Sequence, residues 1–332
     1  MGKAIFSNGN FIFGESGLGR YGQGIGSVKQ VTHDGDTVNV RLLDNLAIRF
    51  LGIDTPETSF DLPEPAGEAN TLNFVSLGDD RWENFLSNPF SSTWKTFSPP
   101  LHHDLHTHLS TATGVGVAKN HHTHAKAAED ELERLIQEDF DSRGLSDENG
   151  RFFMAFANDV MDGYGRLLCY LNIQEPNAER RPVTYNERLL ASGMAVPYFI
   201  WPNIDPFRRE PSLANAALSP TAFRQRIAES PTLSVSRAAV KQARHDRKGI
   251  FSPTDPLMLL PFELRFLARR QPPSRWVIDL AAEDNRIYVP QRYINIPNVE
   301  DRLFLPEEFV PLFTSKGWQA STLEAPCQVA IA

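Results

Sequence analysis

Residues 48–57 read IRFLGIDTPE, and this stretch decides the architecture around it. Its first half is rich in β-branched, aromatic and aliphatic side chains, which predicts a strand that carries Arg49. Pro56 has no N–H to donate to a sheet, so the strand should end just before it. Asp54 and Glu57 are therefore expected at the end of a strand.

The residues before this stretch predict a partner strand. Residues 37–43 and 46–53 are two β-rich runs, and Asp44-Asn45 between them suits a two-residue hairpin turn. Asp34 and Asp36 precede the first run and, being two apart, share one face of an extended chain. Several carboxylates can thus converge at one end of a small sheet, where a hard cation such as calcium would relieve their repulsion.

A second arginine comes from a distant segment. Residues 162–166 read DGYGR and predict a tight turn between strands over 151–157 and 166–173. Arg166 would then lie on a rigid element. Arginine is a planar fork that can hold two phosphate oxygens, and fixed cations stabilise the charge that builds in phosphoryl transfer. A carboxylate such as Glu57 could orient or deprotonate the attacking water.

Taken in order, these blocks resemble the thermonuclease, or staphylococcal-nuclease-like, family. The matching blocks are HDGDTV at 33–38, IRFLGIDTPET at 48–58 and DGYGR at 162–166. The resemblance covers roughly residues 28–253 without an insertion. It implies an α+β fold, namely a five-stranded OB-fold β-barrel with about three helices.

The resemblance also implies an activity and residue roles. Family members are calcium-dependent nucleases that hydrolyse DNA, RNA or both and leave 3′-phosphates. The implied Ca²⁺ site consists of Asp36, Asp54 and the Thr55 carbonyl as direct ligands, with Asp34 in the outer shell. The implied catalytic residues are Arg49 and Arg166 as phosphate clamps and Glu57 as the proposed general base. The implied substrate contacts are Tyr164 and Tyr198, and Phe199 or Trp201 could stack on a base.

The rest of the chain divides by composition. Residues 1–27 form a glycine-rich N-terminal segment, and 28–253 form the nuclease-like domain. Within that domain, residues 59–120 look like a long insertion after the first barrel hairpin, because they show no sustained period. Helices are predicted over 123–139, 186–192 and 233–247. Residues 254–332 are Pro- and Phe-rich and are expected to form a C-terminal accessory region.

Two further groups of residues leave alternatives open. Seven of the nine histidines lie in two groups, within and just after the insertion, and the spacings of His102, His106, His121 and His124 suit a transition metal. The alternative is a polar, solvated loop. In the C-terminal region, Arg269, Arg270 and Arg275 lie near Phe266 and Trp276. They form either a nucleic-acid face or a solvated basic loop.

Composition narrows the class of protein. The 332 residues are 41% hydrophobic, enough for a sizeable core, and carry a formal net charge of −8. This charge argues against a general electrostatic grip on nucleic acid, but not against a few phosphate contacts. Cys169 and Cys327 allow one disulfide at most. No signal peptide or membrane span is recognisable, so we expect a cytoplasmic location, or secretion only if a leader has been removed.

Two main functions remain open at this stage. The first is an active nuclease with DNA or RNA as its substrate, and the second is a nuclease-like domain that has lost turnover and binds nucleic acid or protein. The acidic and arginine residues favour the enzyme. No protein partner can be inferred. A third, weaker reading makes the histidine-rich insertion the main function, as a metal-handling protein.

Overall fold

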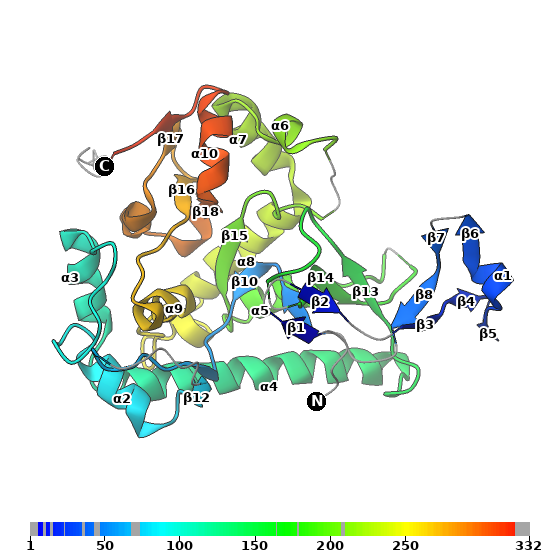
Figure 1. The fold of residues 1–332 in the computed structure, drawn as a ribbon, viewed down its shortest axis with the longest axis horizontal. Helices are drawn as coiled ribbons and strands as arrows, with labels where there is room; N and C mark the ends of the chain where they lie inside the picture. Colours follow the sequence, from blue (N-terminus) through cyan, green and yellow to red (C-terminus); the bar gives the residue numbers. More distant parts are fainter. Residues whose placement is uncertain are drawn as a thin grey trace.

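The computed structural model describes residues 6–8, 11–13, 16–22, 24–34, 37–42, 47–67, 74–163, 165–177, 179–206 and 210–322. Strands and helices alternate along these ranges and give a mixed α+β protein, as predicted (Figure 1). The helices are α1 Val28–Val31, α2 Asp80–Ser87, α3 His103–Ala112, α4 Val117–Arg143, α5 Tyr185–Ala191, α6 Leu213–Ala216, α7 Pro220–Glu229, α8 Pro231–His245, α9 Pro261–Arg269 and α10 Val310–Thr314. The 3-10 turns are η1 Gly249–Phe251, η2 Pro290–Asn295, η3 Val299–Asp301 and η4 Glu307–Phe309.

The strands are short and fall into several sheets. They are β1 Phe6–Asn8, β2 Phe11–Phe13, β3 Ser16–Leu18, β4 Arg20–Tyr21, β5 Gly24–Ile25, β6 Thr32–Asp34, β7 Thr37–Val38, β8 Val40–Leu42, β9 Ile48–Phe50, β10 Gly52–Asp54, β11 Ser59–Asp61, β12 Phe74–Ser76, β13 Phe152–Ala155, β14 Leu167–Ile173, β15 Val196–Ile200, β16 Trp276–Asp279, β17 Arg286–Ile287, β18 Arg302–Leu305 and β19 Gln319–Ala320. The largest sheet has the order β10-β15-β18-β16, and a three-stranded sheet has the order β13-β14-β9. Over the described ranges these sheets do not close into a barrel.

The hairpin expected between residues 37–43 and 46–53 pairs differently in the described strands. β8 pairs with β3, β9 pairs in parallel with β14, and β10 pairs with β15. The second predicted strand is in fact two, because Gly52 has a φ of +75° and turns the chain between β9 and β10. Local pattern alone cannot reveal partners that lie more than a hundred residues away.

The glycine-rich N-terminal segment forms strands where it is described. β3 pairs with β8, β4 with β5, and β6 with β7. With α1, these strands lie at one end of the molecule, away from its main body (Figure 1). Asp34 belongs to this part of the chain.

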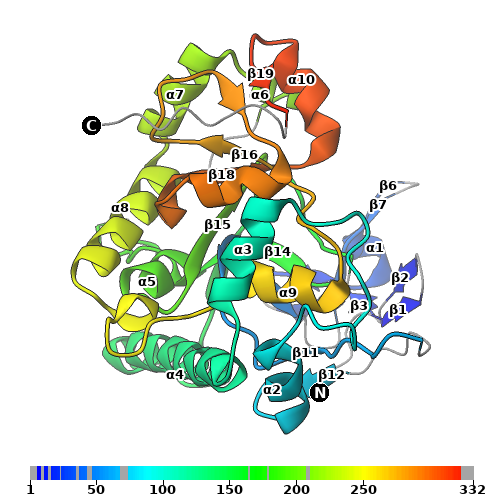
Figure 2. The same ribbon diagram turned by 90° about the vertical axis from the view of Figure 1, so that its left-hand side faces the viewer.

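The predicted insertion is largely ordered and packs against the C-terminal region. It contains β11, β12, α2, α3 and the first residues of α4. Trp82 of α2 is fully buried, and its indole N–H donates to the Val75 carbonyl. The same hydrophobic core contains Phe262 of α9 and Phe304 of β18. Figure 2 shows α9 beside α3 and above the β11–β12 pair.

The helix predicted over 123–139 is confirmed and is longer, spanning α4. Ala128 and Leu135 of this helix are buried, and Leu132 packs against the core that contains Leu135. In Figure 1, α4 runs along one side of the main body. The helices predicted over 186–192 and 233–247 correspond to α5 and α8.

The C-terminal region contributes to the largest sheet. β18 pairs in parallel with β15, and β16 pairs with β18, so residues on both sides of the predicted boundary at 253/254 form one sheet. None of the helices in the described ranges is long and apolar enough to cross a membrane.

Candidate active site

Parallel pairing of β9 with β14 brings two predicted arginines together. Arg49 lies opposite Leu168, and the Leu167 N–H donates to the Ala47 carbonyl at 2.9 Å. Side chains alternate along a strand, so Arg166, two residues before Leu168, faces the same side as Arg49. Their side chains are 35% and 32% exposed, respectively. Asp162 holds Arg166 in place, because its carboxylate accepts from Arg166 Nε at 2.8 Å.

The bend at Gly52 carries Asp54 into the same place. A Cβ at Gly52 would lie 3.0 Å from the Tyr170 hydroxyl, so the position favours glycine for its space as well as its φ. Asn186 of α5 supports the bend, because its side-chain amide donates to the Leu51 carbonyl at 2.8 Å and accepts from the Leu171 N–H. The strand end that the sequence predicted at Asp54 is confirmed.

Asp54 is buried and fully engaged by two guanidinium groups. Its side chain is 1% exposed. Arg49 Nη2 donates to Asp54 Oδ1 at 3.0 Å. Arg265 donates to both oxygens, from Nη1 to Oδ1 at 2.9 Å and from Nη2 to Oδ2 at 2.7 Å. This bidentate pair is the strongest geometry available to an arginine and a carboxylate.

Arg265 also joins Glu57 to the cluster. Its Nη1 donates to Glu57 Oε1 at 2.7 Å, and the Arg265 side chain is 13% exposed. Burial of this guanidinium opposes its charge, but the charges of Asp54 and Glu57 outweigh burial and raise the pKa of Arg265 above its ordinary value. Arg265 could not be predicted from the sequence, because it lies 211 residues from Asp54 in an ordinary amphipathic helix.

The helix that carries Arg265 is firmly anchored. Glu263 of α9 is buried, and its Oε1 accepts from the Tyr293 hydroxyl at 2.7 Å and contacts His108 Nε2 at 2.9 Å. The segment before α9 is held by α4, since Asn120 donates to Asp255 and accepts from the Met258 N–H. Arg265 is therefore presented by a rigid element.

His121 of α4 positions the backbone of Glu57. The Glu57 N–H donates to His121 Nε2 at 2.9 Å, which places the proton of the neutral ring on Nδ1. Burial lowers the pKa of His121 to about 3, so the ring stays neutral near pH 7.

These side chains line a cavity of about 360 Å³. Its polar wall contains Arg49, Asp54, Glu57 and Arg166. Its apolar wall comes from α4 and α5, through residues such as Ala128, Leu132 and Leu189. Thr55 also lines it, so four of the predicted residues and the Thr55 backbone meet at one place.

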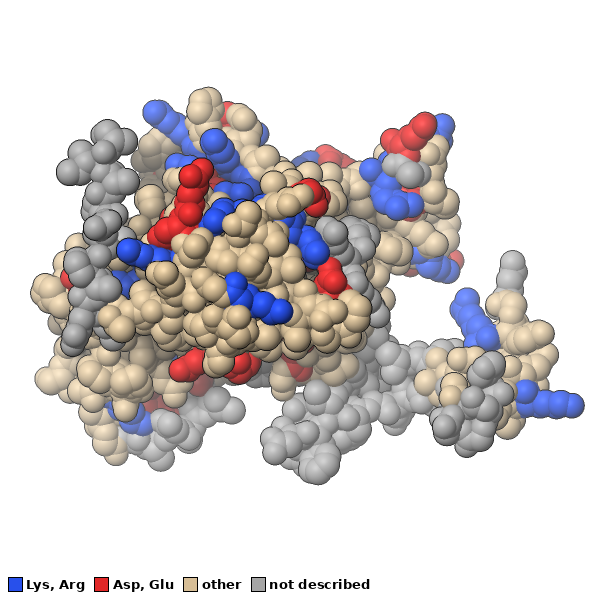
Figure 3. All heavy atoms as spheres, turned by 90° about the horizontal axis from the view of Figure 1, so that it is seen from above, with Lys and Arg blue, Asp and Glu red and all other residues tan. Residues whose placement is uncertain are grey.

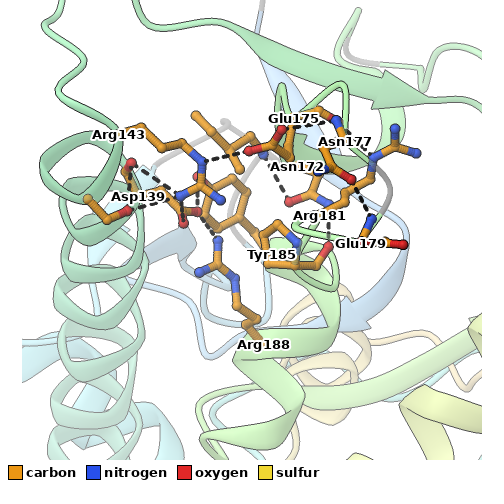
Figure 4. Close-up of polar contacts among 12 residues, drawn as sticks. Asp139, Arg143, Asn172, Glu175, Asn177, Glu179, Arg181, Tyr185 and Arg188 are labelled. Carbon is orange, nitrogen blue, oxygen red and sulfur yellow. Dashed lines mark hydrogen bonds and ion pairs between the residues drawn. The ribbon is translucent and has the colours of Figure 1, made fainter.

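The two helices of the apolar wall are joined by a buried polar network (Figure 4). Asp139 of α4 accepts from the Tyr185 hydroxyl at 2.8 Å and from Arg143 Nη1 at 2.8 Å. Arg188 of α5 pairs with Asp139 Oδ2, the oxygen that also accepts from the Tyr185 hydroxyl. This network fixes the distance between α4 and α5 and thereby the shape of the cavity.

The remaining predicted site residues lie elsewhere or outside the described residues. Asp36 and Tyr164 are outside the described part of the chain. Asp34 lies in β6, opposite Thr37, and its side chain is also outside it. Tyr198 does not line the cavity described above.

Tyr198 and its neighbours have internal partners instead. The Tyr198 hydroxyl accepts from Arg275 Nη1 at 2.8 Å, and its ring stacks on Phe262. Phe199 and Trp201 are buried in a core and do not present a face to a base. Arg270 is also buried, with its guanidinium 4.3 Å from the Phe97 ring centroid, whereas Arg269 is exposed.

The four predicted metal-binding histidines perform separate tasks. His102 caps the start of α3, and His106 packs against Phe90. His121 and His124 are buried in α4. Over the described ranges, no group of three or more His, Cys, Asp or Glu side chains is arranged to hold a metal ion.

The expected calcium ion would need free oxygen atoms on Asp54 and Glu57. Both Asp54 oxygens and one Glu57 oxygen are taken by Arg265. A guanidinium in that position repels a divalent cation, so the described arrangement does not fit the ion. Asp36 falls outside the described residues.

Comparison with known proteins adds one finding. The chain is similar to Endonuclease YhcR of Bacillus subtilis (strain 168). The two are 24% identical over 273 residues, which are 82% of this chain and 15% of YhcR. No protein-family model matches the chain.

The match with YhcR is longer than the predicted nuclease-like domain. Because residues 28–253 are fewer than 273, the aligned part must include residues from the N-terminal segment or the C-terminal region. The chain spans only a small part of YhcR, so the similarity concerns one portion of that protein. The similarity suggests a relationship to a nuclease, and it assigns no role to any residue of this chain.

The surface seen from above shows no large basic area. In Figure 3, Lys and Arg side chains are scattered among Asp and Glu on this face of the described residues. This agrees with the net charge of −8. Any contact with a polyanion on this face is therefore local.

Proposed function

We propose that this chain is a nuclease that hydrolyses phosphodiester bonds in DNA, RNA or both. The observation that carries the proposal is the meeting of Arg49, Arg166, Asp54 and Glu57 on the wall of one cavity. These residues come from β9, the position just before β14, β10 and the loop after β10. The similarity to Endonuclease YhcR supports the same reaction class.

Each residue has a role that its chemistry supports. Arg49 in β9 and Arg166 just before β14 line the cavity and could hold the non-bridging phosphate oxygens of a substrate. Fixed cations at that place stabilise charge that develops on the phosphate in the transition state. Glu57, held at its backbone by His121, would orient or deprotonate the attacking water.

We also propose, from the family resemblance, that the nuclease depends on calcium, leaves 3′-phosphates and has an OB-fold barrel. Asp36, Asp54 and the Thr55 carbonyl would be direct ligands, with Asp34 and Tyr164 in the roles that the family motif implies. Asp54 is engaged by Arg265 in the structure, so no step of the reaction is derived through the ion.

A nuclease assay tests this proposal. Purified protein should cleave a single-stranded oligonucleotide in the presence of calcium, and EGTA should stop cleavage. Arg166→Ala and Glu57→Gln should each lower the rate by about 10²-fold or more. Arg180→Ala, which removes the same charge from an exposed position, should have no effect.

Several outcomes would contradict parts of the proposal. Unchanged turnover in both Arg166→Ala and Glu57→Gln would place the active site elsewhere. Cleavage that survives EGTA would remove calcium. Products with 3′-hydroxyl ends would remove the proposed direction of bond breakage.

The second candidate function is a binding module without turnover. The observation that favours it is the ion pair of Arg265 with Asp54 and Glu57, which neutralises the carboxylates that a nuclease would use. A gel-shift of the same oligonucleotide that depends on Arg49 and Arg166, with no cleavage under any metal, would favour this candidate over the enzyme.

A further inference from the structure

Glu57 is held at two points by helices that lie far from it in the sequence. Its backbone N–H donates to His121 Nε2 of α4 at 2.9 Å, and its carboxylate Oε1 accepts from Arg265 Nη1 of α9 at 2.7 Å. Glu57 itself lines the cavity. Because one carboxylate oxygen and the backbone of the same residue are fixed, the direction of the other oxygen, Oε2, is set as well.

Arg265 is a rigid point of attachment for this carboxylate. Its guanidinium forms a bidentate pair with the buried Asp54, from Nη1 to Oδ1 at 2.9 Å and from Nη2 to Oδ2 at 2.7 Å. At the other end of the side chain, Leu264 and Leu267 hold the same helix by being fully buried. Arg265 therefore transmits the position of α9 to Glu57.

Arg265 also balances charge beside the cavity. Asp54 and Glu57 bring two negative charges, and Arg49, which donates to Asp54 at 3.0 Å, brings one positive charge. Without Arg265 this group would carry a net negative charge and would repel the phosphate of a substrate. Arg265 is not one of the described residues that line the cavity, so it acts through the two carboxylates and not on the substrate.

We propose that Arg265 is a positioning residue for Glu57, and that α9 thereby aims the carboxylate that orients or deprotonates the attacking water. The inference rests on the proposed function, in which Glu57 has that role. It goes beyond the proposed function by making the site depend on a residue outside the predicted nuclease-like domain, in the C-terminal region.

Steady-state cleavage of the single-stranded oligonucleotide by the full chain, with calcium present, tests this inference. Arg265→Lys keeps the positive charge but loses the planar fork that reaches both carboxylates. We expect kcat to fall about tenfold while KM stays within about twofold, because the charge balance is kept and the aim of Glu57 is lost. Arg265→Met removes the charge as well, so it should also raise KM.

A double-mutant cycle in kcat separates positioning from general stabilisation of the fold. In the Glu57→Gln protein there is no carboxylate left to aim, so Arg265→Lys should lower kcat by no more than about twofold. A residue that only stabilised the fold would lower kcat by the same factor in both backgrounds. Arg269→Lys, at an exposed position one turn away in α9, is the matched control and should leave kcat unchanged in both.

Each outcome decides the inference. Circular dichroism checks folding, and Arg265→Gln takes the place of Arg265→Lys in the cycle if the latter is unfolded. If the wild type cleaves, an unchanged kcat in the folded Arg265 variants overturns this inference and leaves the proposed function standing. An equal loss in the Glu57→Gln background, or an equal loss in Arg269→Lys, does the same. No cleavage by the wild type under any metal overturns the proposed function and this inference with it.

Discussion

At the scale of single residues, His121 shows how closely the insertion is tied to the candidate site. The ring is fully buried in α4, yet it accepts the N–H of Glu57, a residue 64 positions earlier. Burial keeps the ring neutral and lowers its pKa to about 3, from an ordinary value near 6.5. The loop that carries Glu57 is therefore held by a group that has to stay uncharged.

This burial predicts a pH-dependent loss of stability. Between pH 6.5 and 3 the unfolded chain binds a proton at His121 that the folded chain does not, so stability falls as pH falls through this window. From pH 7 to pH 5 the wild type should lose about 2 kcal/mol more than His121→Gln, measured by urea unfolding. His103→Gln, at an exposed position, should behave like the wild type. Parallel losses in the wild type and His121→Gln would contradict the prediction.

The same scale shows what the sequence could predict of the site. Arg49, Asp54, Glu57 and Arg166 were recognisable, because local motifs carry them and strand ends can be located from Pro and Gly. Arg265 was not, since its neighbours only signal an amphipathic helix. A side chain that acts through a contact across 211 residues leaves no local pattern.

At the scale of elements, two glycines allow close backbone contact between the residues after α5 and the start of η1. Gly193 has a φ of +71°, and a Cβ there would lie 2.5 Å from the Lys248 carbonyl oxygen. Gly249 has a φ of +49°, and a Cβ there would lie 2.1 Å from the Gly193 carbonyl oxygen. The Ile250 N–H donates to that same carbonyl at 2.8 Å. The contact fixes α5, whose Asn186 supports the bend before Asp54.

Gly193→Ala should therefore destabilise the fold through both strain and collision. We expect a loss of about 3 kcal/mol in the free energy of unfolding, measured by urea denaturation. Gly144→Ala is the control, because Gly144 also has a positive φ but has open space around its Cβ. It should cost about 1 kcal/mol. Equal losses in the two variants would show that the Lys248 contact is unimportant.

The elements also differ in how well sequence foretold them. α4, α5, α8 and the β13–β14 pair agree with prediction because each has a clear period or a stop signal such as Gly193. The pairing of β9 and β10 did not agree, because one residue at positive φ, Gly52, divides the run between two sheets. Strand partners depend on global packing, which hydrophobic pattern does not encode.

At the scale of the whole molecule, the C-terminal region completes structures that begin near the N-terminus. β18 pairs with β15, which in turn pairs with β10 next to the candidate site. The hydrophobic core that contains Trp82 of the predicted insertion also includes Phe262, Phe266 and Tyr293. The Pro- and Phe-rich composition of residues 254–332 predicted an accessory region. Composition alone does not show which core these side chains join.

A chain cut after residue 253 should fail to fold stably. The cut would expose the apolar faces of Tyr198 and Leu105 and remove the pairing partner of β15. We expect loss of cooperative urea unfolding and binding of a hydrophobic dye. Removal of residues 1–27 is the comparison and should be much milder, because β3, β4 and β5 of that segment lie away from the main body. A cooperative, well-folded 1–253 fragment would contradict this prediction.

The separation between Asp54 and Arg265 also sets an order of events during synthesis. The ribosome makes Asp54 211 positions, and Glu57 208 positions, before it makes Arg265. At about 5–20 residues per second, this leaves an interval of roughly 10–40 s. Throughout that interval the nascent chain carries Asp54 and Glu57 without Arg265, so the ion pairs that join these residues to α9 form only after α9 has been made.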